Sequence, residues 1–185
     1  MAAKMVERRG GGFPWRVAGW SVAALLLVQP AVAMQFTSQV NWSGGDFLLM
    51  GALLGGAGLG IELAVRKSAS PAYRAGAALA LLAGFLTVVV NGAVGIIGSE
   101  NEAANLFYLA APAFALIGAA AARFRAAGMA WAMTAAGLAT LLVPVIAIAF
   151  RLSGASAVWS PEVPVATGVL AGLWFLSAWL LRRAA

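Results

Sequence analysis

Six apolar runs, each about as long as a membrane-spanning helix, divide this sequence. A helix needs about 20 mainly apolar residues to cross the hydrocarbon core of a bilayer. The connections between the runs are short, so no soluble domain fits between them and neighbouring spans are expected to pack as antiparallel hairpins. The sequence therefore predicts an all-α integral membrane bundle with a basic N-terminal segment, 1–16, and one transmembrane domain, 17–185. Its six helices are expected at about 17–36, 47–65, 76–98, 105–122, 129–150 and 163–181.

Composition supports a lipid environment. Hydrophobic residues make up 63% of the chain and charged residues 10%, whereas soluble domains carry about 25% charged residues. The net charge of +6 would indicate a nucleic-acid partner if the basic residues formed one patch, but they are spread between the apolar runs. The chain has no Cys, which excludes thiol chemistry, and no His, which is the commonest metal ligand and general base near neutral pH. We therefore expect no enzyme activity, no cofactor and no nucleic-acid partner.

The distribution of basic residues predicts an orientation. Eleven of the twelve basic residues fall in segments that would share one side of the membrane, and Arg151 is the exception. Cytoplasmic segments carry the excess of Lys and Arg, which predicts that both termini are cytoplasmic. The eleven are Lys4, Arg8, Arg9, Arg16, Arg66, Lys67, Arg74, Arg123, Arg125, Arg182 and Arg183.

Acidic residues lie mainly in the opposite, periplasmic connections. They are Asp46, Glu100, Glu102 and Glu162. Carboxylates could form a cation site, since hard cations take oxygen ligands. Two of the four, however, stand where a capping box needs an acid, and orientation alone explains acidic outer loops. We therefore expect no metal site.

The first run has a second interpretation. A basic start, an apolar stretch and the sequence Ala31-Val-Ala33 are typical of a cleaved secretory signal. Cleavage would leave five spans, each with its orientation unchanged. The apolar stretch continues to Phe36, however, and is long enough to span a membrane. We therefore favour a retained helix.

Local signals mark several helix ends. Ser43 with Asp46, and Ser99 with Glu102, have the spacing of a capping box. Ser70-Pro71 and Ser160-Pro161 each offer a cap followed by proline at the first helical position. Gly98 and Gly128 stand where helix ends favour a left-handed residue.

Trp residues gather near the predicted span ends, as in the aromatic belts of membrane proteins. They are Trp15, Trp42, Trp159 and Trp179, with Trp131 also close to an end. Such a belt places the indole rings at the level of the lipid headgroups.

Glycine spacing indicates close helix packing. Helices in lipid associate where small residues let their backbones approach, as in GxxxG pairs. We favour packing within the chain, with a dimer or partner interface as the alternative. The candidate positions are Gly51, Gly55, Gly56, Gly60, Gly84, Gly92, Gly95, Gly168 and Gly172.

Two polar residues inside the spans are candidates for function, because polar groups at membrane depth are costly. Glu62 lies near the cytoplasmic end of the second span with Arg66 one turn later, and an ion pair on one helix face explains it. Asn91 lies deeper in the third span and is expected to bond to another helix. Pro112 and Pro144 fall inside the fourth and fifth spans and should bend them.

Two stretches, 46–66 and 91–108, resemble a family of small, uncharacterised inner-membrane proteins of proteobacteria. The first reads Asp46-Phe-Leu-Leu-Met-Gly-Ala-Leu-Leu-Gly-Gly-Ala-Gly-Leu-Gly-Ile-Glu-Leu-Ala-Val-Arg66, and the second begins Asn91-Gly-Ala-Val-Gly-Ile-Ile-Gly-Ser-Glu-Asn-Glu. The resemblance covers roughly 34–150. It implies a multi-pass protein of the bacterial inner membrane and implies no particular activity.

Two function classes remain. Short loops, glycine-rich helices and few reactive groups favour a non-catalytic accessory, assembly or stabilising subunit that binds other membrane subunits or itself. The alternative is a small oligomeric transporter or channel for a small solute or ion, which would use Glu62, Asn91 and the two proline sites.

Overall fold

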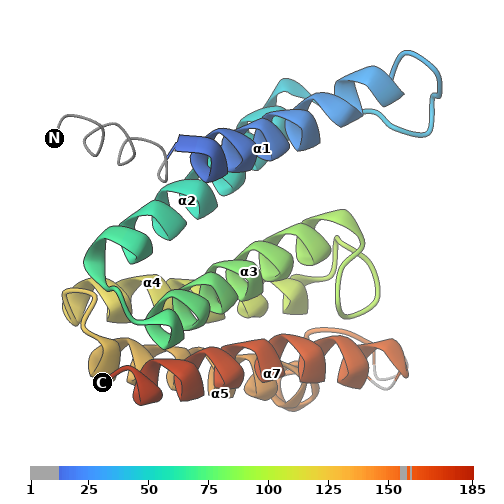
Figure 1. Ribbon diagram of the computed structural model, residues 1–185. Helices are drawn as coiled ribbons and strands as arrows, with labels where there is room; N and C mark the ends of the chain where they lie inside the picture. Colours follow the sequence, from blue (N-terminus) through green and yellow to red (C-terminus); the bar gives the residue numbers. More distant parts are fainter. Residues whose placement is uncertain (1–12, 155–157, 159) are drawn as a thin grey trace, which may run out of the picture. The chain divides into compact units, whose positions relative to one another are not determined.

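A computed structural model describes residues 13–154, 158 and 160–185. Within these residues the chain forms helices and no strand, and six helical segments are long and apolar enough to cross a membrane. The predicted six-helix membrane architecture is therefore confirmed (Figure 1). Lys4, Arg8, Arg9 and Trp159 lie outside the described residues. The helices are α1 (Phe13–Ala33), α2 (Gly44–Lys67), α3 (Pro71–Ala93), the 3-10 helix η1 (Ala103–Leu109), α4 (Ala110–Ala121), α5 (Ala126–Ala149) and α7 (Glu162–Arg183).

The chain divides into two compact units, Met1–Leu59 and Gly60–Ala185. In the first unit, α1 and the first part of α2 form an antiparallel hairpin. The Trp20 ring reaches to 3.0 Å from the position a Cβ on Gly58 would take, and Leu27 Cδ2 to 3.7 Å from that of Gly51. The two contacts are two turns apart in each helix, which defines one continuous seam.

The start of α2 has a local cause. Ser43 donates from its backbone N and its Oγ to Asp46 Oδ2 at 2.7 and 2.8 Å, and Asp46 N donates to Ser43 Oγ at 3.3 Å. This is the predicted capping box. The flanking rings of Trp42 and Phe47 meet edge-on with centroids 5.2 Å apart, which is the hydrophobic staple that often accompanies such a box. Local sequence is therefore sufficient to begin this helix.

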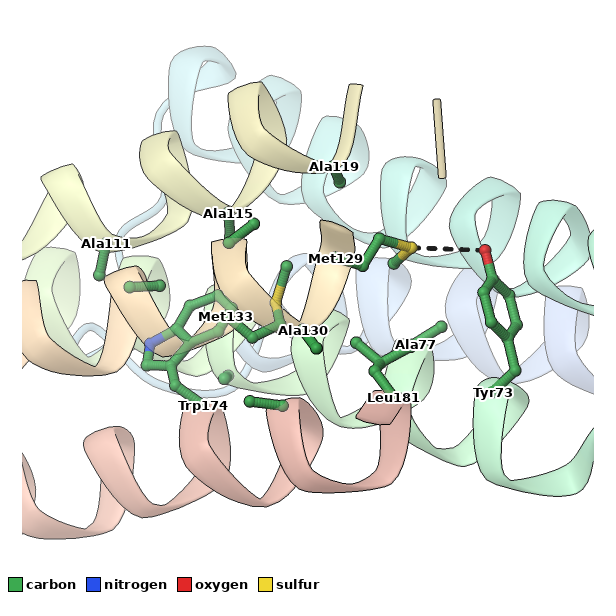
Figure 2. Packing of buried hydrophobic residues seen from close by; sticks show 14 of the residues in the cluster. Tyr73, Ala77, Ala111, Ala115, Ala119, Met129, Ala130, Met133, Trp174 and Leu181 are labelled. Carbon is green, nitrogen blue, oxygen red and sulfur yellow. Dashed lines mark hydrogen bonds between the residues drawn. The ribbon is translucent and has the colours of Figure 1, made fainter. Parts of the chain in front are cut away.

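The second unit places α7 between α3 and α5, and α5 packs against α4 on its other side. Its larger core is built mainly from alanines; the bulky members are Tyr73, Met129, Met133, Trp174 and Leu181. Figure 2 shows Ala111, Ala115 and Ala119 following one face of α4. Small core side chains let helix backbones approach closely, which in lipid is the main source of attraction between helices.

The α4–α5 pair is the closest of these contacts. A Cβ added to Gly118 would lie 2.5 Å from Ala132 Cβ, and one added to Gly128 would collide with Ala122 Cβ. Ala122, the C-cap of α4, follows Gly118 by one turn, and Ala132 follows Gly128 by one turn on α5. Each glycine therefore faces an alanine of the opposite helix.

The left-handed position predicted at Gly128 is wrong. Gly128 lies inside α5, and the left-handed residues at this turn are Arg123 (φ 50°) and Phe124 (φ 57°). Phe124 N donates to Ala119 O at 2.9 Å, which is the bond that closes a Schellman cap. Tyr73 Oη donates to Phe124 O at 2.8 Å, so a contact from α3 supports a turn that the local sequence does not favour. Gly98 is left-handed (φ 66°) as predicted, but it lies in the loop and not at a helix end: α3 ends at Ala93, and the left-handed residue just after it is Gly95 (φ 73°).

The fourth span begins differently from the prediction. Its N-cap is Glu102 without a side-chain cap bond, and Glu102 N donates instead to Ser99 O at 3.1 Å. The prediction of a capping box at Ser99 and Glu102 is therefore wrong. The segment opens as η1 and becomes α-helical only at Ala110, so Pro112 lies in the first turn of α4, where a missing N–H breaks no helical bond. Pro144 lies inside α5.

Candidate functional site

Buried amides gather at the end of the second unit where α3 stops and η1 begins. The side chain of Asn105 is 2% exposed. Its Oδ1 accepts from Ile96 N at 3.1 Å and Ile97 N at 2.9 Å, and its Nδ2 donates to Ile97 O at 3.1 Å and Ser99 O at 2.6 Å. One amide thus satisfies the irregular backbone of this loop, as buried non-helical backbone requires.

Asn91 extends the same cluster. Its Nδ2 donates to Asn105 O at 2.8 Å, and because a backbone carbonyl can only accept, this bond fixes which way the amide points. Asn91 is 7% exposed, and its Oδ1 has no hydrogen-bond partner in the described part of the chain. A single free carbonyl oxygen can accept a hydrogen bond from water or a ligand, but it cannot transfer a proton at neutral pH.

Two further polar contacts join α7 to its neighbours. Tyr108 Oη and Thr167 Oγ1 lie 2.6 Å apart and link η1 to α7. Ser177 Oγ donates to Gly76 O at 2.7 Å and links α7 to α3. All of these side chains are buried. Their bonds hold helices together, and none of them pairs a nucleophile with a base.

Glu62 lies on α2, close to the connection between α2 and α3, whereas Asn91 lies at the far end of α3. Its Oε2 is 3.2 Å from Nη2 of Arg66, the i+4 partner predicted for it, and the Arg66 side chain is largely exposed. Arg74, in the first turn of α3, donates to Ser68 O at 2.8 Å and Val65 O at 3.2 Å, which fixes the end of α2 beside the start of α3. Glu62 and Asn91 are therefore separated by most of the length of α3 and do not share a site.

The four acids expected to share one side of the membrane take separate positions. Asp46 caps α2 in the first unit, Glu100 and Glu102 lie in the loop before η1, and Glu162 opens α7. Among the described residues, no group of three or more Asp, Glu, His or Cys side chains is arranged to hold a metal ion. Glu100 Oε1 instead accepts from Asn101 Nδ2 at 3.2 Å.

The glycines named from spacing have three different surroundings. In the first group, a side chain fills the space beside the glycine. Leu27 lies beside Gly51, Leu81 lies beside Gly60, and Trp174 and Pro112 lie beside Gly84. Gly95 has a φ of 73° and crowds Ser99 and Asn105, so its role is in the loop. The remaining ones have no described atom within 4 Å of a Cβ position: Gly55, Gly56, Gly92, Gly168 and Gly172.

Several contacts were missed by reasoning from the sequence. The closest helix contact uses Gly118 and Gly128, whose spacing to Ala122 and Ala132 is a small-xxx-small signal, whereas the predicted positions were all glycines. The pairing of Tyr108 with Thr167 gives no sequence signal beyond the presence of polar groups in apolar runs. Comparison of the chain with family models, curated proteins and solved structures found no match.

Proposed function

We propose that this chain is a non-catalytic subunit of a larger membrane complex and that it binds a partner helix through the outward face of α7. The observation that carries the proposal is the pair Gly168 and Gly172, one turn apart and exposed, with no described atom within 4 Å of either Cβ position. Val165, Val169 and Leu176 are exposed around this pair. A GxxxG pair between apolar side chains is a surface on which a second helix can pack closely in lipid.

A contrast within the second unit supports this interpretation. Glycines on its inward faces are closed by its own side chains: Leu181 covers Gly76, Trp174 covers Gly84, and Phe175 covers Gly137. Gly168 and Gly172 differ because no described side chain of the unit covers them. Glycine also lowers helix stability by about 1 kcal/mol relative to alanine, so two exposed glycines are a cost that a packed partner would offset.

The polar groups of the unit support an assembly role rather than a catalytic one. Asn105, Tyr108, Thr167 and Ser177 are joined to other parts of the same unit by hydrogen bonds. In the proposed setting, the protein lies in a bacterial inner membrane with both termini cytoplasmic. The partners would be other membrane subunits.

Co-purification in mild detergent tests the proposal. The wild-type chain should carry a stoichiometric membrane partner, and Gly168→Leu with Gly172→Leu should remove it while thermal unfolding of the chain stays unchanged. Ala135→Leu is the control, because Ala135 is exposed on α5 and gains a leucine side chain on another helix. A chain that is monodisperse alone, with no partner after cross-linking, contradicts the proposal, as does equal loss of the partner in the control.

A small oligomeric transporter or channel is the second candidate, favoured by the free Oδ1 of Asn91 beside a span that is not α-helical throughout. Discontinuous helices often form transport sites. Flux of small ions into proteoliposomes is the test. Loss of a measurable flux in Asn91→Ala would favour this candidate, whereas flux unchanged in both Asn91→Ala and Glu62→Gln would remove these residues from it.

A further inference from the structure

Exposed basic residues gather at one end of the second unit, which we call the basic end. Two contacts bring its segments together. Tyr73 Oη bonds to Phe124 O in the α4–α5 turn, and Ser177 of α7 bonds to Gly76 of α3. The only acid among the described residues of this end is Glu62. The basic residues are Arg66, Lys67, Arg74, Arg123, Arg125, Arg182 and Arg183.

Not all of these cations are equally available. Arg66 is paired with Glu62, and Arg74 donates to two backbone carbonyls at the end of α2. Arg182 donates from Nη2 to Thr134 Oγ1 at 3.1 Å. Because a guanidinium has five N–H donors, Arg182 keeps most of its donors for another acceptor.

Two tryptophan–arginine pairs stand side by side where α5 and α7 meet at this end. Arg182 Cζ lies 5.4 Å from the ring centroid of Trp131, and Arg183 Cζ lies 3.7 Å from that of Trp179. Trp131 is 71% exposed and Trp179 is 45% exposed. The rings hold both guanidinium groups by cation–π contact and restrict them to the surface of these two helices. We call these four residues the Trp–Arg surface.

We propose that the Trp–Arg surface binds the phosphate group of an anionic phospholipid. Guanidinium groups match phosphate oxygens with paired hydrogen bonds, and the excess of positive charge at the basic end adds long-range attraction. Exposed tryptophans are typical of the headgroup level of a membrane. Leu138 on α5 and Leu176 on α7 are exposed one to two turns further along the same helices, where the acyl chains of a bound lipid would lie.

A lipid fits this surface better than a soluble phosphate. A soluble anion would use the arginines alone and leave two large rings exposed to water, whereas a phospholipid covers the rings with its glycerol and acyl region. A zwitterionic headgroup brings its own cation and therefore gains less from the excess charge. The two proposals share Leu176 but rest on different residues, because Gly172 is two turns, about 10 Å, from Trp179 along α7.

Native mass spectrometry of the detergent-solubilised full chain tests this proposal. The protein is titrated with phosphatidylglycerol and phosphatidylcholine in equal amounts, and the apparent dissociation constant is read from the bound fractions. We expect preference for phosphatidylglycerol. Arg182→Gln and Arg183→Gln should each weaken its binding about fivefold, since one basic residue near an anionic surface contributes about that factor. Arg151→Gln, at the opposite end of α5, should leave the binding unchanged.

A second pair of variants separates a defined site from general charge attraction. Arg182→Lys and Arg183→Lys keep the charge but lose the planar stacking, and we expect them to weaken binding less than the glutamine variants but measurably. Circular dichroism confirms that each variant is folded, and a glutamine variant that fails to fold is replaced by its lysine counterpart. Equal affinity in Arg182→Gln, Arg183→Gln and Arg151→Gln overturns the proposal. Displacement of the lipid by equimolar inorganic phosphate also overturns it, because the ligand would then be a free anion.

Discussion

Two hairpins of this chain are both rich in small residues, yet they pack by different means. In the α1–α2 hairpin, the long side chains of Trp20 and Leu27 reach across to glycines, so the backbones stay apart. In the α4–α5 hairpin, Gly118 and Gly128 face alanines directly, and the backbones themselves approach. The same residue type therefore serves two purposes. In the α1–α2 hairpin, glycine leaves space for a large side chain of the opposite helix. In the α4–α5 hairpin, the missing Cβ of glycine lets the two backbones approach.

The difference has consequences for what each hairpin tolerates. The tip of a tryptophan ring or a leucine can move by rotation about its side-chain bonds, whereas an alanine Cβ moves only with its backbone. Added volume at the α4–α5 seam must therefore separate the helices, while added volume in the α1–α2 seam can be accommodated locally. Dispersion attraction falls off steeply with separation, so added volume in the α4–α5 seam weakens the contacts along the whole seam.

The largest expected effect is that of Gly128→Ala. The new Cβ would collide with Ala122 Cβ, and overpacking of this kind costs about 1–3 kcal/mol, which exceeds the gain in helix propensity from alanine. After the gain in helix propensity is subtracted, we expect the free energy of unfolding to fall by about 1–2 kcal/mol, measured by steric trapping or reversible denaturation in bicelles. Ala122→Gly in the same chain exchanges the two residues and should restore most of the loss. A double variant as unstable as the single one would contradict the seam described above.

A smaller effect is expected at the turn that makes the close seam possible. Tyr73→Phe removes the hydrogen bond to Phe124 O. The turn with two left-handed residues, Arg123 and Phe124, then has one supporting contact fewer. Losing a bond of this kind costs about 1 kcal/mol. Limited trypsin digestion should therefore cut faster after Arg123 and Arg125, with cleavage after Lys67 as the internal control. An equal increase at all three sites would indicate general unfolding instead.

Most features that depend on short-range sequence were predicted correctly, but Ser160 does not cap α7, whose N-cap is Pro161 without a side-chain cap bond. The six helices follow from apolar length. The box of Ser43 and Asp46, the cap of Ser70 before Pro71, and the pair of Glu62 with Arg66 each depend on residues within four positions of one another. Local rules are sufficient there because the interacting groups are joined by one helical turn.

The failures have a common physical cause. The Ser99 box does not form because the loop before η1 is organised by Asn105, and the loop bonds link residues six to nine positions apart. Gly128 is not at a helix end because Tyr73, far away in sequence, supports two left-handed residues at the preceding turn. Which glycine faces which helix depends on the rotation and register of packed helices, and spacing along one helix does not contain that information.

The smallest expected effect tests the first hairpin with the same substitution. Gly58→Ala places a Cβ 3.0 Å from the tip of the Trp20 ring, which is closer than an ordinary contact but can be relieved by a small ring rotation. Alanine gains about 1 kcal/mol of helix propensity over glycine, so the two terms nearly cancel and the free energy of unfolding should change by less than about 0.5 kcal/mol. The measurement is the one used for Gly128→Ala. A loss as large as at Gly128 would mean that the α1–α2 backbones approach as closely as those of α4 and α5, and the distinction between the two hairpins would be wrong.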